Sequence, residues 1–134
     1  MSDEIVYFVP VEDKNGERRM SFVMDRLYGS KNRDIYYNHA AILVKKAKEL
    51  KKRFPEARIS VLLTASSAMS CAARLDAREL ASHIGVPQTA TVVEHESLGV
   101  EIPESGFGDH YIEINEGSAR RAGRREVGGI EIIF

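Results

Sequence analysis

The amino-acid sequence predicts an α/β domain of the α+β kind, with the element order ββ-α-β-α-β-β-β. Three observations carry this prediction. Apolar and polar residues alternate near both ends of the chain, one long central segment repeats its apolar residues every three or four positions, and the composition is that of a globular protein. Of the 134 residues, 43% are hydrophobic and 29% are charged. This length allows one core without disulfides or a structural metal, so we expect a single domain over residues 1–134.

The chain is expected to open with a β-hairpin within residues 1–30. Ile5 to Glu12 and Arg18 to Met24 are β-like runs, and the Asn15-Gly16 pair between them is a strong signal for a tight turn. The second run alternates apolar residues with others, as a half-buried strand does. Residues 25–34 are polar and predict a loop.

The longest helix is predicted from Ile35 to Phe54. Its apolar residues recur at helical spacing with lysines between them, and Pro55 ends it because proline disfavours helical backbone in the residue before it. The apolar stripe consists of Ala40, Leu43, Val44, Ala47, Leu50 and Phe54.

A continuously apolar run, Ile59 to Leu63, predicts a central strand covered on both faces. Small residues follow at 64–68, and Ser66 or Ser67 is expected to cap a second helix that ends at Gly85. Thr89 to Val93 then predicts a strand, and the glycines and proline of residues 96–108 predict an irregular loop. The last two strands are predicted at 110–115 and 127–134, joined by an arginine-rich segment.

The net charge is only −1, but the charges are segregated along the chain. Residues 31–58 contain nine basic and three acidic side chains. Residues 90–117 contain seven acidic side chains and no lysine or arginine. A protein that is neutral in sum can therefore present a basic surface to a polyanion.

Three parts of the sequence resemble the archaeal chromatin protein Alba and its relatives over residues 37–134. They are the helix start Asn38-His39-Ala40-Ala41-Ile42, the strand, small-residue turn and Ala-rich helix from Ile59 to Ile84, and the closing segment from Arg124 to Phe134. The resemblance implies a compact two-layer β-α-β-α-β-β domain with a mixed sheet. Here it would form an Alba-like core at 31–134, preceded by the N-terminal hairpin. The family binds DNA and RNA as a homodimer, which implies nucleic acid and a second copy of the chain as partners.

If the domain binds nucleic acid, arginine and lysine side chains are expected to contact the phosphates. The arginine-rich segment is the first candidate, and the bases around the first helix extend it. The predicted contacts are Arg120, Arg121, Arg124, Arg125, Lys31, Arg33, Lys45 and Lys46. The sequence does not distinguish DNA from RNA.

Two other classes of function stay open. The turn from Thr64 to Cys71 offers backbone N–H groups to an anion, with Ser66 and Ser67 as anion-binding residues of a small enzyme or a phosphoanion-binding protein. Cys71 near the start of a helix, with a histidine or an acid from residues 94–110, would serve such an enzyme. In a third alternative, the protein is an interaction module, and the acidic segment 94–116 would bind a basic partner.

Cofactor and metal sites are not indicated. The chain has neither Gly-x-x-x-x-Gly-Lys nor Gly-x-Gly-x-x-Gly, and His95 between Glu94 and Glu96 has no metal-site spacing. We therefore expect no cofactor, no metal and no catalytic residue. Apolar stretches are far shorter than the roughly eighteen residues of a membrane span. The acidic N-terminal residues and the single cysteine predict a cytoplasmic protein that does not bind membranes.

Overall fold

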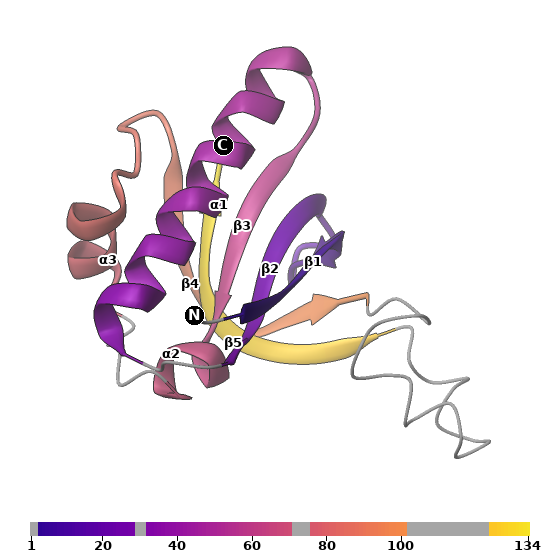
Figure 1. Cartoon of the computed structure of the whole chain (residues 1–134). Coiled ribbons are helices and arrows are strands. Elements are labelled where there is room, and N and C mark those ends of the chain that lie inside the picture. The colour runs from indigo at the N-terminus through magenta and orange to yellow at the C-terminus, as the bar shows by residue number, and fades with distance from the viewer. Residues whose placement is uncertain (1–2, 29–31, 71–75, 102–123) are drawn as a thin grey trace.

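A computed structural model of the chain describes residues 3–28, 32–70, 76–101 and 124–134 (Figure 1). It confirms the mixed α+β class. The described elements are β1 (Asp3–Glu12), β2 (Arg18–Tyr28), α1 (Arg33–Arg53), β3 (Ile59–Thr64), α2 (Ala65–Ser70), α3 (Ala77–Ile84), β4 (Thr91–Val100) and β5 (Arg125–Ile133).

The described strands close into a small barrel in the order β1-β2-β3-β5-β4. Strands β2 and β3 are parallel and the other neighbours are antiparallel, so the sheet is mixed as predicted. The barrel closes through only two residue pairs between β1 and β4, Val11 with Val100 and Glu12 with Gly99. The predicted hairpin is present as β1 and β2, and its second strand pairs with β3. The hairpin is therefore part of the barrel wall.

The turn of this hairpin is held by Asp13 and Gly16. The Asp13 carboxylate accepts hydrogen bonds from the backbone N–H groups of Asn15 and Glu17, at 2.9 and 3.1 Å. Gly16 has a φ of +82°, which suits glycine because it has no Cβ. The Asn-Gly signal thus corresponds to the observed turn.

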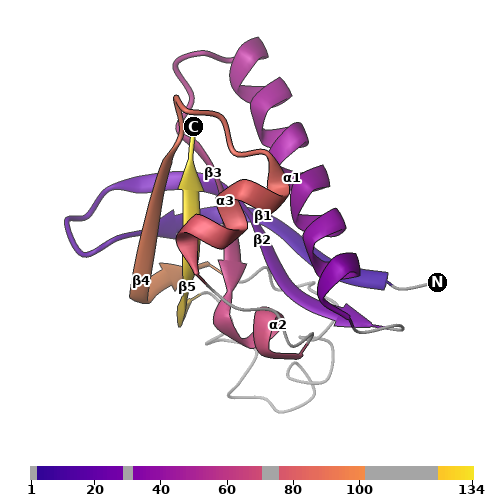
Figure 2. The same ribbon diagram turned by 90° about the vertical axis from the view of Figure 1, so that its left-hand side faces the viewer.

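Two apolar cores lie on opposite faces of the sheet. The larger core fills the space between the helices and the outer faces of β2, β3 and β5. Helices α1 and α3 lie side by side over it (Figure 2), and the Tyr37 ring on α1 stacks on His83 of α3 with centroids 4.6 Å apart. The helices cover one face of a sheet that closes into a barrel, which is not clearly the two-layer arrangement that the resemblance implies. The smaller core lies inside the barrel and consists of Val9, Val11, Val23, Leu62, Leu98 and Val100.

The predicted second helix differs from the observed structure. Instead of one helix running to Gly85, the chain forms α2 and α3, and residues 71–75 lie outside the described part. The residue that caps α2 is Thr64, whose side-chain oxygen accepts a hydrogen bond from the Ser67 N–H at 3.2 Å. Asp76 caps α3, an N-cap signal that an Ala-rich pattern obscured. Gly85 ends α3 in the left-handed conformation, as predicted.

Strand β4 runs to Val100, seven residues beyond its predicted end at Val93 and through part of the predicted loop. The pairing of β4 with β5 shifts between His95 and Leu98, because one extra residue bulges out of β4. The strand continues beyond this bulge through residues that the sequence assigned to an irregular loop. The predicted strand at 110–115 lies outside the described residues.

Strand β5 approaches β3 closely at Gly129. A Cβ atom at this position would clash with the backbone carbonyl oxygen of Leu63 on the neighbouring strand. A Cβ at Gly99, in contrast, would meet only the far end of the exposed Arg124 side chain, which can move aside.

We therefore expect Gly129→Ala to lower the free energy of unfolding by about 1–3 kcal/mol, the usual cost of overpacking, and Gly99→Ala to cost much less. Urea denaturation followed by circular dichroism measures both. Equal losses in the two variants would contradict the close approach of β5 to β3.

Candidate functional site

Helix α1 is the most basic element of the described structure. Its N-terminus is capped by Asn32, whose side chain accepts a hydrogen bond from the Ile35 N–H at 2.9 Å. From Arg33 to Arg53 the helix carries seven basic and two acidic residues, and Lys51, Lys52 and Arg53 fall in its last turn. Positive charge there is favourable because the helix dipole is negative at the C-terminal end. The same lysines leave a strongly basic solvent face.

The exposed lysines of α1 lie on two different flanks. Lys45, Lys48 and Lys52 are three and four residues apart, so they share one flank. Lys46 lies about 100° further round the helix and shares the other flank with Arg53. Of the two lysines predicted as contacts, Lys45 therefore belongs to one basic stripe and Lys46 to the other.

A shallow pocket borders the first of these flanks. It has a volume of about 430 Å³ and is lined by Lys48, Lys51, Lys52, Pro87, Thr89 and Phe134. The Lys51 ammonium donates a hydrogen bond to the backbone carbonyl of Ala57 at 2.6 Å, which fixes it at the end of the helix. Lys48 and Lys52 are exposed and take part in no ion pair between described residues. The pocket thus combines two available cations with an apolar wall.

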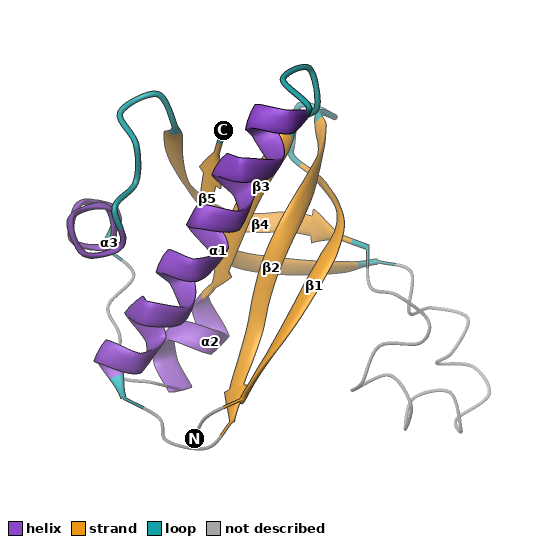
Figure 3. Cartoon of the chain, turned by 45° about the horizontal axis from the view of Figure 1, so that its top comes forward, coloured by secondary structure: helices purple, strands orange, loops and turns teal. Residues whose placement is uncertain are grey.

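The predicted arginine contacts lie elsewhere. Arg124 is exposed and forms ion pairs with Glu12 and Glu126, at 3.5 and 3.9 Å, and Arg125 begins β5 on the surface. The start of β5 lies at the end of the barrel away from α1 (Figures 1 and 3). Arg33 lies at the other end of α1, about 22 Å along the helix from Lys48. Lys31, Arg120 and Arg121 lie outside the described residues. The described bases therefore form separate patches.

The turn between β3 and α2 uses its hydroxyl groups internally. Ser67 is buried, and its hydroxyl donates a hydrogen bond to the Thr64 carbonyl at 2.8 Å and lies 3.1 Å from the Tyr36 hydroxyl. Ser66 is exposed. Cys71 lies outside the described part. Of the two serines that were predicted to bind an anion, only Ser66 is exposed to solvent.

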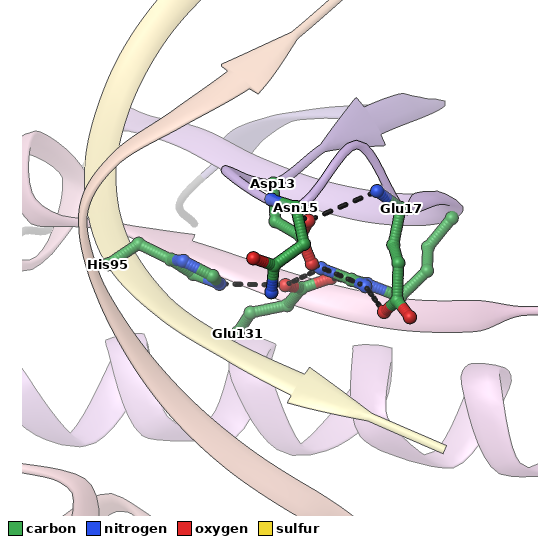
Figure 4. A network of polar contacts seen from close by, with 6 residues as sticks. Asp13, Asn15, Glu17, His95 and Glu131 are labelled. Atoms are coloured by element: carbon green, nitrogen blue, oxygen red, sulfur yellow. Dashed lines mark hydrogen bonds and ion pairs between the residues drawn. The ribbon is translucent and has the colours of Figure 1, made fainter.

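The structure contains a second polar site that the sequence did not predict. It is a buried network at one mouth of the barrel (Figure 4). The Arg19 guanidinium donates from Nε and Nη2 to both oxygens of Glu131, at 2.7 and 2.8 Å. His95 Nε2 lies 2.8 Å from the same carboxylate. The Glu131 side chain is 0% exposed and that of Arg19 is 5% exposed, so the pair is removed from water.

The network extends to the hairpin turn. Arg19 Nη1 also reaches the carboxylates of Asp13 and Glu17, at 3.2 and 3.4 Å. The hydrogen bonds to Glu131 raise the Arg19 pKa above its usual value although burial opposes this. Burial would raise the Asp13 pKa, but hydrogen bonds from Glu17, Arg19 and Asn15 outweigh it and lower that pKa. Both shifts favour the charged forms, because each charge has its partner in place.

This network borders a cleft of about 400 Å³ beside the hairpin turn. Four carboxylates line it, from Asp13, Glu17, Glu94 and Glu96, against the two basic side chains of Lys14 and Arg19. The cleft therefore repels anions. Within the described residues, no group of three or more histidines, cysteines and acids is arranged to hold a metal ion.

The residues of this network come from three distant strands, β2, β4 and β5. The sequence drew attention to His95 and its two glutamates but not to Arg19 or Glu131. One signal was available, since Glu131 is a lone acid inside the apolar run Ile130 to Phe134. A charge in such a run indicates a buried partner, which only the sheet order identifies.

Comparison with protein-family models, with curated proteins and with solved structures gave no match. In the described part of the chain, no helix has the length and apolar character needed to cross a membrane.

The buried pair gives a test by mutation. We expect Glu131→Gln or Arg19→Met to lower the free energy of unfolding by about 3–5 kcal/mol, because each removes one charge of the pair and leaves the other buried without its bidentate partner. The double variant Arg19→Met/Glu131→Leu should be more stable than either single variant. Urea denaturation measures all three.

Arg18→Met is the matched control. Arg18 forms an ion pair of 2.6 Å with Glu101, but both side chains are about half exposed. Such a surface pair contributes at most about 1 kcal/mol. Single variants of the buried pair that lose no more than this control would contradict the importance of the network.

Proposed function

We propose that the protein binds nucleic acid and contacts its phosphates through Lys45, Lys48 and Lys52 of α1. The observation that carries the proposal is that these exposed lysines share one flank of a single helix, with Lys48 and Lys52 beside a pocket and outside every ion pair between described residues. Ammonium groups without carboxylate partners are the groups that a polyanion recruits.

The distribution of the other charges supports the same proposal. Ile133 borders the acidic cleft, and the next residue, Phe134, borders the lysine pocket, so the two sites lie on opposite faces of the sheet. The sheet and its core separate the acidic cleft from the lysines of α1. A polyanion can therefore approach the helix without meeting the carboxylates of the acidic cleft. The low net charge of the whole chain does not oppose this approach.

Several parts of this proposal rest on the Alba-like resemblance. They are the two-layer core at 31–134, the assignment of either RNA or DNA as the ligand, and contacts from the arginine segment. The described bases lie in separate patches, so a long nucleic acid or a dimer would be needed to use the α1 lysines and Arg124 together. A cytoplasmic location belongs to the same proposal.

The homodimer has one structural argument in its favour, the exposed Phe8 ring on β1. Strand β1 pairs with β2 along its full length, but on its other edge only Val11 and Glu12 pair with β4. The stretch 5–9 carries no charge, and Phe8 is 43% exposed against Phe22. An uncharged strand with an exposed aromatic ring pairs readily with a second strand.

For the lysine contacts, the test compares two variants that each remove two positive charges from α1. Lys48→Gln/Lys52→Gln should weaken binding to a labelled oligonucleotide and reduce the slope of log K against log salt by about 0.7–0.9 for each lost contact. Lys46→Gln/Arg53→Gln, on the other flank, should change both much less. Fluorescence anisotropy at several salt concentrations measures the binding. No binding by the unaltered protein at low salt would contradict the proposed function, and equal effects of the two variants would contradict the assigned flank.

For the dimer, the test uses two exposed phenylalanines. Phe8→Lys places a charge on the exposed surface of β1 and should convert the dimer to a monomer. Phe54→Lys makes the same change at a 55% exposed ring beyond the end of α1 and should leave the dimer intact. Sedimentation velocity without nucleic acid measures both. An unaltered protein that stays monomeric at every concentration would overturn this part of the proposal.

A further inference from the structure

The pocket beside the lysines has an aromatic wall whose position is fixed by the sheet. The Phe134 backbone N–H donates a hydrogen bond to the Ile59 carbonyl at 3.0 Å, and the ring packs against the main core while staying partly exposed. The C-terminal end of the chain lies beside the second half of α1 and the loop before β4 (Figures 1 and 3). Phe134 therefore reaches the pocket from a rigid support.

The residues that line the pocket are of two kinds. Pro87 and Phe134 are apolar, whereas Lys48, Lys52 and the exposed Thr89 are polar. A bare phosphate ion would use only the lysines, and an apolar ligand would leave them without a partner. A ligand that joins a flat ring to a phosphate matches both kinds. The pocket volume of about 430 Å³ lies in the range of sites for small ligands.

Resting on the proposed function, we infer that this pocket receives one unpaired base of a single-stranded nucleic acid. The base lies against the Phe134 ring, and its phosphates lie at Lys48 and Lys52. A base in a duplex has both faces covered by its neighbours, so only a single strand or an unpaired loop offers a free face to the ring. Stacking on an aromatic side chain tolerates every base. The pocket is therefore expected to distinguish single strands from duplexes and not one sequence from another.

The experiment compares a labelled single-stranded oligouridylate with an RNA duplex of the same length. Stacking of one base contributes about 1–3 kcal/mol. We therefore expect Phe134→Ala to weaken binding of the single strand roughly 5- to 150-fold and to leave duplex binding unchanged. Phe134→Leu, which keeps an apolar side chain against the core but has no ring, should show the same selective loss. Phe54→Ala, at an exposed ring that does not line the pocket, is the control and should change neither.

The outcomes separate this inference from the proposed function. If the unaltered protein binds neither RNA, the proposed function is wrong. If it binds RNA but Phe134→Leu binds the single strand as tightly as before, only the pocket assignment is wrong. A loss that is equal for single strand and duplex also overturns it, and thermal denaturation of each variant checks that the fold is intact. Competition by uridine monophosphate, and none by inorganic phosphate at the same concentration, would further support a site for base and phosphate together.

Discussion

The barrel depends on one buried ion pair, Arg19 with Glu131. A carboxylate removed from water costs several kcal/mol unless its charge is matched and its oxygens are hydrogen-bonded. Here both conditions are met, because the guanidinium binds both Glu131 oxygens and His95 contacts one of them. Arg19 comes from β2 and Glu131 from β5, with β3 between them. The pair therefore fixes the curvature of three adjacent strands, and an open, flatter sheet would separate its members.

This polar end of the barrel is joined to an apolar end along the same strands. The inward face of β2 carries Arg19, Ser21 and Val23 in alternation, and Ser21 lies opposite Ser60 of β3. Both serine hydroxyls are buried without a hydrogen-bond partner among the described residues. Beyond them, Val23, Leu62 and Leu98 fill the interior. The interior thus changes from charged to apolar within a few residues, and small hydroxyl side chains occupy the boundary.

The same curvature separates charges of opposite sign on the surface. Alternation along β4 and β5 directs His95 and Glu131 into the acidic mouth of the barrel, while Phe134 faces the lysines of α1. Because a sheet and an apolar core lie between the two regions, the carboxylates of the cleft do not neutralise the helix. Among the described residues, the acidic cleft and the lysine pocket thus lie on different sides of the sheet. It is this separation that makes an anionic ligand at α1 a reasonable proposal for a chain with a net charge of −1.

The sequence by itself determined the elements whose signals are local. Asn15-Gly16 identified the hairpin turn, the spacing of apolar residues identified α1, and the continuous apolar run identified β3, because each depends on neighbours within a few residues. Only the tertiary structure decided the closure of the sheet, the bulge in β4, and the pairing of Arg19 with Glu131 across 112 residues of chain. It also decided that Phe134 meets Lys48 and Lys52. These depend on strand order and on which face each side chain takes, and no short pattern in a single sequence contains that information.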